Sequence, residues 1–179
     1  MISRACSRLE AEPAPGLRIR LARVDEADRL TQIAIVSKAH WGYPPSWLAL
    51  WKAGMTITAE HIHAQHVLVA ESVLPGSSRI DGTAAVSLPR QQSSDAAIEG
   101  PAELEHFWVS PDAMGAGVGR ALMNAVLRYC SDENVDVLRI EADPNAVAFY
   151  ERFGAAQVGE VESVPSPRRL PVLEITINR

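Results

Sequence analysis

Residues 103–130, ELEHFWVSPDAMGAGVGRALMNAVLRYC, contain the most informative pattern in the chain. An alternating, aromatic-rich segment ends at Val109, and a turn sequence follows it. Glycine then occupies every second position, at Gly115, Gly117 and Gly119, directly before an amphipathic run. This order predicts a strand, a glycine-rich loop and a helix. Such a loop leaves backbone N–H groups uncovered at the positive end of the helix dipole, so it predicts a site for phosphate.

Spacing excludes the two common nucleotide-binding loops. A dinucleotide-binding loop has the pattern G-x-G-x-x-G, but its last glycine would fall on Arg120 or on Leu122. A P-loop requires Gly-Lys-Ser or Gly-Lys-Thr, and the chain has neither. The remaining alternative is an ordinary strand-to-helix turn. Three glycines within five residues argue against it, because each one loses more conformational entropy on folding than any other residue.

Length and composition indicate one globular domain. The chain has 179 residues, of which 47% are hydrophobic and 22% are charged. Its longest apolar runs fall short of the roughly 18 residues that a membrane span needs, so no membrane partner is expected. The first residues carry charges but no apolar core of a secretory signal. We therefore predict a cytoplasmic protein with a flexible leader over residues 1–16 and one domain over residues 17–179.

Charge and cysteine content argue against other classes of partner. The net charge of −5 makes a nucleic-acid partner unexpected. The two cysteines, Cys6 and Cys130, are far apart, so neither a disulfide nor a thiolate metal centre is expected. His61, His63 and His66 cluster without a thiolate, and the first two cannot share a helix face. We predict no metal site.

Hydrophobic periodicity predicts the other elements. Strands are expected at residues 17–23, 66–71, 80–88, 102–109, 136–141, 156–161 and 171–177. Helices are expected at residues 25–40, 46–54 and 58–65, after the glycine loop, and at 143–153. The hairpin in the first half favours antiparallel pairing, and the helical connections in the second half favour parallel pairing. Together they predict a single α/β domain with a mixed sheet and helices on both faces.

The glycine loop resembles the acyl-CoA loop of the GNAT superfamily of N-acetyltransferases, whose pattern is Gln/Arg-x-x-Gly-x-Gly/Ala. Met114 takes the first place, Gly117 the glycine place and Gly119 the last small-residue place. Since Met114 departs from Gln/Arg, backbone donors would do most of the phosphate binding. A second segment, EADPNAVAFYERFGAA at residues 141–156, resembles the next strand and helix of the family. Its informative places are held by Asn145, Ala148, Phe149, Tyr150 and Gly154.

The resemblance implies a GNAT-like domain with a mostly antiparallel sheet of six to seven strands. It also implies an N-acetyltransferase in which acetyl-CoA and an amine bind together and the amine attacks the thioester directly. The CoA pyrophosphate would lie on the backbone of Met114, Gly115, Ala116, Gly117, Val118, Gly119 and Arg120. Phe107, Trp108 and Val109 would pair with pantetheine beside a splayed strand, and Asn145 would contact the CoA arm. Homodimers are common in the family. A non-catalytic acyl-CoA-binding module on the same fold is the alternative.

Three residues are predicted to carry the chemistry. Tyr150 matches the general acid of the family, which assists the departing thiolate. A phenol has a pKa of ~10 and a thiol ~8.5, so proton transfer is uphill by roughly 2 kcal/mol and we favour a hydrogen bond. Glu103 and Glu105 are the leading base candidates, because a carboxylate within a central strand is costly without a partner or a role. Alternation places both glutamates on the face of Phe107 and Val109, and His106, the reserve base, on the face of Leu104 and Trp108.

The acceptor is predicted to lie near HWGYPPSWLALW, residues 40–51, because the corresponding region shapes the acceptor site in the family. Trp41 and Tyr43 are expected to line that pocket, whereas Trp47 and Trp51 are expected to pack in the core. The acidic surface and the aromatic segment favour an amine that is a small molecule or an amino-acid derivative.

Overall fold

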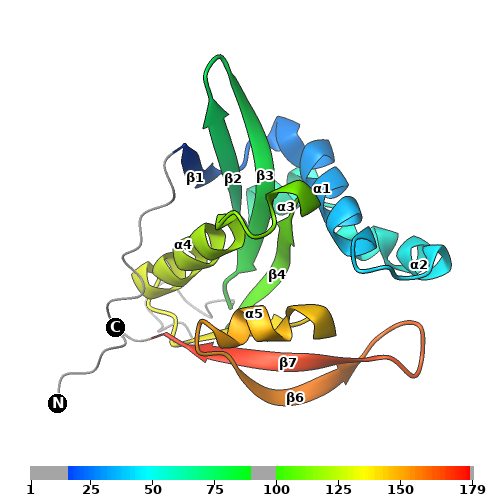
Figure 1. Ribbon diagram of the computed structural model, residues 1–179. Coiled ribbons are helices and arrows are strands. Elements are labelled where there is room, and N and C mark those ends of the chain that lie inside the picture. The colour runs from blue at the N-terminus through cyan, green and yellow to red at the C-terminus, as the bar shows by residue number, and fades with distance from the viewer. Residues whose placement is uncertain (1–15, 90–99, 178–179) are drawn as a thin grey trace.

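Seven strands form one sheet in the order β1-β2-β3-β4-β5-β7-β6 (Figure 1). The computed structural model describes residues 16–89 and 100–177. The strands are β1 (Leu17–Leu21), β2 (His66–Leu74), β3 (Ser77–Ser87), β4 (Ala102–Val109), β5 (Val137–Glu141), β6 (Ala156–Glu162) and β7 (Arg169–Thr176). All neighbours are antiparallel except β4 and β5. The predicted α/β fold with a mostly antiparallel sheet is confirmed, but parallel pairing in the second half extends no further than β4–β5.

Helices cover both faces of the sheet. They are α1 (Ala27–Ala39), α2 (Pro45–Met55), α3 (Ala59–Ala64), α4 (Val118–Asp132) and α5 (Val147–Glu151). α4 and α5 lie on one face, and α1 and α3 lie behind the other (Figure 1). No helix within the described ranges is long and apolar enough to cross a membrane. Apart from Gly16, whose carbonyl accepts a hydrogen bond from the Val73 amide at 2.6 Å, the predicted leader lies outside the described residues.

Two hydrophobic clusters flank the central strand β3. Its segment from Asp81 to Val86 is fully buried, because both faces are covered. Ala84 and Val86 join the larger cluster under α4, which buries Leu122 and Val126 at helical spacing. Ala85 joins the smaller cluster, which buries Leu30 of α1 and Ile57 at the approach to α3. The amphipathic pattern after the glycines therefore forms the helix that the sequence predicts.

The sheet opens between β4 and β5. These strands pair at two positions only, Ala102 with Leu138 and Glu103 with Arg139. Beyond that point β4 stays paired with β3 up to Val109, while β5 stays paired with β7. Figure 1 shows the result: the antiparallel strands β2, β3 and β4 stand side by side, and β6 and β7 cross beneath them at a steep angle. The splayed strand that the family resemblance implied is present.

A β-bulge in β4 changes which side chains share a face. Val86 pairs with Leu104 and Ala85 with His106, so Glu105 is the extra residue. Leu104 consequently packs in the same cluster as Phe107 and Val109, under α4. The predicted grouping of Leu104 with His106 and Trp108 is wrong, as is the predicted grouping of Glu103 with Phe107. Simple alternation fails here because the bulge adds one residue to the strand.

Candidate active site

The glycine loop forms a backbone cradle at the start of α4. A single 3-10 turn, η3 (Pro111–Ala113), leads into it. Gly115 has φ of 81° and Gly117 has φ of 87°, a left-handed conformation that side chains with a Cβ rarely adopt. Gly117 is the N-cap of α4, and the first-turn amides of a helix lack partners within the helix. These amides and the helix dipole make the loop suited to a phosphate.

Arg120 and Gly119 serve this loop in different ways. A Cβ added at Gly117 would lie 3.8 Å from the Arg120 Nη2 atom, so this guanidinium lies against the loop and adds positive charge there. Gly119 is helical, and a Cβ on it would lie 3.2 Å from the Phe149 Cε2 atom. Gly119 therefore lets α4 approach α5 closely, a packing role beside its place in the loop.

Tyr150 is a buried phenol beside the free edge of β4. Its side chain is 6% exposed, and its ring centroid lies 5.9 Å from that of Phe107 and 5.2 Å from that of Phe149. Within residues 16–89 and 100–177, no group forms a hydrogen bond with its hydroxyl. Burial raises the pKa of Tyr150, and the Asp143 carboxylate raises it further. The hydroxyl therefore stays protonated and is free to donate a hydrogen bond to a ligand.

An open groove of about 740 Å³ lies between β4 and the β6–β7 pair. Glutamates predominate among the charged residues that line it, namely Glu103, Glu105, Glu141 and Glu160, with Arg139 as the one arginine in the lining. An acidic groove of this kind suits a cationic ligand such as a protonated amine. The groove brings both predicted base candidates to one site.

The two base candidates have different surroundings. Burial raises the pKa of Glu103, although Arg139, whose Nη1 atom lies 3.8 Å from the Glu103 Oε1 atom, lowers it in part. Glu105 is exposed at the bulge and accepts a hydrogen bond from Gln65 Nε2. A carboxyl with a raised pKa is the stronger base, so Glu103 is the better candidate.

His106 is poorly placed to act as a base. It is 6% exposed, and its Nδ1 atom accepts a hydrogen bond of 3.1 Å from the Trp108 indole. Burial lowers the pKa of His106. Because His106 Nδ1 accepts this hydrogen bond, the proton of the neutral imidazole is assigned to Nε2. The basic lone pair on Nδ1 is then already engaged by the Trp108 indole and cannot accept a proton from the amine.

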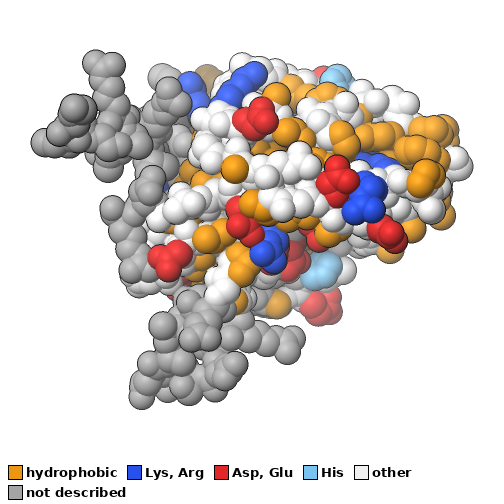
Figure 2. Space-filling model, turned by 90° about the horizontal axis from the view of Figure 1, so that it is seen from below, with side chains coloured by type: hydrophobic (Ala, Val, Ile, Leu, Met, Phe, Trp, Pro, Cys, Tyr) orange, Lys and Arg blue, Asp and Glu red, His pale blue; other side chains and the backbone are white. Residues whose placement is uncertain are grey.

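Tyr43 lies in a cluster of aromatic rings, and Trp41 does not. The ring centroid of Tyr43 lies 5.0 Å from that of Trp51 and 6.0 Å from that of Trp47. Trp41 is 40% exposed and contacts His40 instead. The predicted core packing of Trp47 and Trp51 is wrong, because both are half-buried and belong to neither hydrophobic cluster. The Trp51 indole instead donates a 2.6 Å hydrogen bond to the Val164 carbonyl in the β6–β7 connection. Apolar side chains are visible at the end of the molecule that carries α2 (Figure 2).

Asn145 lies just before α5, within hydrogen-bond distance of Tyr43. Its Nδ2 atom donates hydrogen bonds of 3.0 Å to the Tyr43 hydroxyl and to Asp143 Oδ1. The Tyr43 hydroxyl in turn donates to Asp143 Oδ1 at 2.9 Å. These contacts join the start of α5 to the aromatic cluster, and the predicted contact of Asn145 with the CoA arm stays a prediction.

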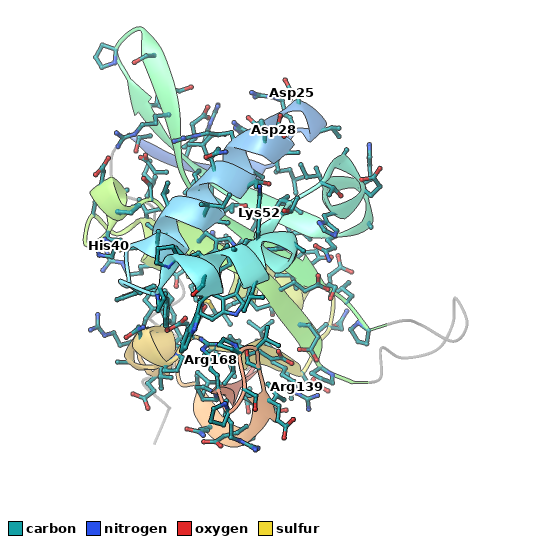
Figure 3. All side chains as sticks on the ribbon, turned by 90° about the vertical axis from the view of Figure 1, so that its right-hand side faces the viewer. Asp25, Asp28, His40, Lys52, Arg139 and Arg168 are labelled. Atoms are coloured by element: carbon teal, nitrogen blue, oxygen red, sulfur yellow. The ribbon has the colours of Figure 1, made fainter. Side chains whose placement is uncertain are left out.

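Three charged residues at this junction were missed by the sequence analysis. Lys38 of α1 and Arg168 of the β6–β7 connection both reach the Asp143 carboxylate, Arg168 through Nη2 at 3.4 Å. Figure 3 shows Arg168 between α2 and the β6–β7 pair. One signal was available, because Lys38 belongs to the buried stripe of α1 with Leu30, Ile33, Ala34 and Ser37. A lysine in such a stripe indicates a buried partner.

Residues 55–164 match the family model described as an acetyltransferase (GNAT) domain. The chain belongs to this GNAT acetyltransferase family. The matched residues include the glycine loop, the opening between β4 and β5, and Tyr150. The search of curated proteins gives no significant match to this GNAT domain.

Solved structures share the fold of this GNAT domain at low identity. A GCN5-related N-acetyltransferase from Rhodopseudomonas palustris is 20% identical with a TM-score of 0.67, over 93% of this chain and 96% of that one. PaiA N-acetyltransferase from Thermoplasma acidophilum, solved with coenzyme A, is 15% identical with a TM-score of 0.66, over 89% and 98%. The yncA protein of Salmonella typhimurium, solved with its cofactor acetyl-CoA, is 17% identical with a TM-score of 0.61, over 91% and 95%.

Proposed function

We propose that this GNAT domain transfers an acetyl group from acetyl-CoA to the nitrogen of an amine, and that the amine is a small molecule or an amino-acid derivative. The observation that carries the proposal is the opening between β4 and β5, with the glycine loop at the end of β4 and the Tyr150 hydroxyl, which no described residue hydrogen-bonds, beside it. The structures of relatives with coenzyme A or acetyl-CoA support this choice of donor. Cytoplasmic location and a homodimer stay predictions.

The chain offers acetyl-CoA two kinds of contact. The amides around Gly117 and the Arg120 guanidinium would hold the pyrophosphate. The edge of β4 beyond Glu103 is not paired with β5, so its backbone groups would pair with the pantetheine amides as an added strand does. A backbone amide on the same edge would polarise the thioester carbonyl as charge develops on its oxygen.

The acceptor amine would attack the thioester carbon directly from the acidic groove. An alkylamine at neutral pH is mostly protonated, and losing that proton costs about 4–5 kcal/mol. Glu103, with its raised pKa, would accept the proton directly or through one water. The new C–N bond forms, the C–S bond breaks, the thiolate of CoA leaves, and the nitrogen, now part of an amide, loses its second proton to solvent.

Tyr150 would stabilise the departing thiolate by donating a hydrogen bond. Burial raises the pKa of this phenol, so full proton transfer to a thiolate is even less favourable than for a phenol in water. A strong hydrogen bond to the sulfur needs no such transfer. The thiolate would then take its proton from solvent as CoA departs.

A turnover assay tests the proposal. The protein is incubated with acetyl-CoA and a broad panel of amines, free thiol is measured, and acetylated products are confirmed by mass spectrometry. We expect thiol release above the hydrolysis background with some of the amines. Tight CoA binding without thiol release from any amine would instead favour a non-catalytic acyl-CoA-binding module.

A further inference from the structure

A cluster beside Tyr150 holds two cations against one carboxylate. The Lys38 ammonium forms an ion pair with Asp143, and Arg168 Nη2 lies 3.4 Å from the same carboxylate. The side chains of Lys38 and Arg168 are only 10% and 9% exposed. Among residues 16–89 and 100–177, neither cation forms an ion pair with a second carboxylate. The cluster therefore carries one excess positive charge that is largely removed from water.

The two cations also keep unused hydrogen-bond donors. An ammonium has three N–H donors and a guanidinium has five. Lys38 bonds to Asp143, and Arg168 bonds to Asp143 and, through Nη1 at 2.9 Å, to the Ser163 hydroxyl. Arg168 also donates a hydrogen bond to the Tyr43 hydroxyl, so about half of the N–H donors of the two cations are engaged by described residues. An excess buried charge with free donors is costly, and an anion would complete it.

Two aromatic rings, those of Trp51 and Tyr43, pack against the same cations. The Trp51 ring centroid lies 4.7 Å from both Lys38 Nζ and Arg168 Cζ. The Tyr43 ring centroid lies 5.1 Å from Lys38 Nζ and 5.6 Å from Arg168 Cζ. Such rings hold cations in place and offer an apolar surface to the rest of a ligand.

The cluster adjoins both the acidic groove and Tyr150. The groove lining includes Glu141 and Leu170, which are two residues from Asp143 and Arg168 in the sequence. The charge of Asp143 acts on Tyr150. One ligand could therefore present an ammonium to the glutamates and an anionic group to Arg168 and Lys38.

We propose that Arg168 and Lys38 bind a carboxylate of the acceptor, so that the acceptor is an amino acid or another amine that carries a carboxylate. The inference rests on the proposed N-acetyltransferase function and names the substrate class of the same site. A bidentate contact with the Arg168 fork would orient the carboxylate, and Lys38 would add charge. Trp51 and Tyr43 would contact the remainder of the acceptor.

Matched acceptor triads test the substrate class in turnover. Each triad holds an L-amino acid, its primary amide and its decarboxylated amine, for the common amino acids. We expect kcat/KM for the preferred acid to exceed that of its amide and amine by roughly 10- to 100-fold. Equal or faster turnover of the uncharged partners would overturn the carboxylate site and leave acetyl transfer intact. No turnover of any acceptor would count against the proposed function, and binding then decides about the site.

Calorimetric titration in the presence of CoA tests binding without turnover. The same acids and amides are titrated into the wild type and into Arg168→Gln, Arg168→Lys and Arg128→Gln. Arg128 is the control, because it is exposed on α4, a helix that contributes no residue to the groove lining. We expect Arg168→Gln to lose the roughly 10-fold or larger preference for the acid, Arg168→Lys to keep part of it, and Arg128→Gln to keep all of it. Two results would overturn the proposal. In the first, the wild type binds an acid and its amide equally well; in the second, Arg168→Gln keeps the preference for the acid.

Discussion

Lys38 of α1 and Asp143, two residues after the end of β5, form an ion pair although 105 residues separate them in the sequence. Their side chains are 10% and 13% exposed. Burial lowers the pKa of Lys38, and the Asp143 carboxylate partly restores it. Burial opposes the ionised form of Asp143, yet Lys38 and the Asn145 amide together lower its pKa. The pair therefore links α1 to the second half of the sheet, across the opening between β4 and β5.

Replacing Asp143 with Asn should destabilise the protein, because it leaves Lys38 and Arg168 charged and without a counter-ion. Breaking a largely buried pair from one side costs about 3 kcal/mol. Urea unfolding at neutral pH measures the loss. Asp132→Asn is the control, since Asp132 is exposed at the end of α4. The unfolding free energies of Asp143→Asn and Asp132→Asn could instead agree within about 0.5 kcal/mol. That result would show that the cluster does not stabilise the packing of α1 against the second half of the sheet.

Removing the Tyr150 hydroxyl should slow turnover without unfolding the protein. Tyr150→Phe loses the proposed hydrogen bond to the leaving thiolate, so kcat should fall roughly 100-fold. The melting temperature should stay unchanged, because the hydroxyl has no hydrogen bond with the described residues. Tyr129→Phe is the control, since Tyr129 stacks on His66 with 3.6 Å between ring centroids, in α4 rather than α5. A kcat of Tyr150→Phe equal to that of the wild type would make Tyr150 a packing residue.

Alanine at Gly117 should weaken CoA binding. The φ of 87° places this residue in the left-handed region, where a Cβ costs about 1 kcal/mol, and relief of that strain would turn the loop amides away from the phosphates. Gly54→Ala is the opposite case. Gly54 lies in α2 with no atom within 4 Å of an added Cβ, so alanine should stabilise the protein by roughly 0.5 kcal/mol. Thermal shift and CoA titration separate the two effects, and unchanged CoA affinity in Gly117→Ala would remove the loop from the phosphate site.

Much of the fold could be predicted, because its signals are local. Glycine spacing and helical periodicity specify the loop and α4, and alternation specifies most strands. The bulge at Glu105 could not be predicted in this way, because it depends on pairing with β3 and follows no local pattern. The pairing of β5 with β7 was missed for the same reason, since strand order is set by long-range contacts.

The candidate site was predicted in part. The family resemblance pointed to Tyr150, glycine spacing pointed to the loop, and the aromatic segment pointed to Tyr43; the roles of these residues stay predictions. The cluster of Lys38, Asp143 and Arg168 assembles from three segments far apart in the chain, and none of these residues lies in a recognisable motif beyond the cap position of Asp143. Such a cluster is visible only when the segments are folded together.

Glu71 should make stability depend on pH in the acid range. Arg20 and Arg18 donate hydrogen bonds to this buried carboxylate, as does Ser78 at 2.8 Å, and they lower its pKa from 4.5 to about 2. Because the folded pKa is the lower one, this stabilisation is complete above pH 4.5 and is lost as the pH falls towards 2. Glu71→Gln should therefore melt roughly 2–5 °C below the wild type at pH 7, with a smaller gap at pH 3. Glu162→Gln, at an exposed position, is the control, and a gap that does not change with pH would contradict the assignment.

Glu103 should control the acid limb of the pH–rate profile if it accepts the proton of the amine. The carboxylate must be ionised to act, so kcat/KM should fall as the pH falls through its raised pKa. Glu103→Gln should lower kcat/KM by roughly 100-fold and abolish this limb, while the limb due to ionisation of the amine itself persists in every variant. Glu105→Gln is the matched variant, because Glu105 lines the same groove but is exposed at the bulge. The opposite result, in which Glu105→Gln removes the limb and Glu103→Gln keeps it, would make Glu105 the base. Glu103 would then have only a structural role, in its ion pair with Arg139.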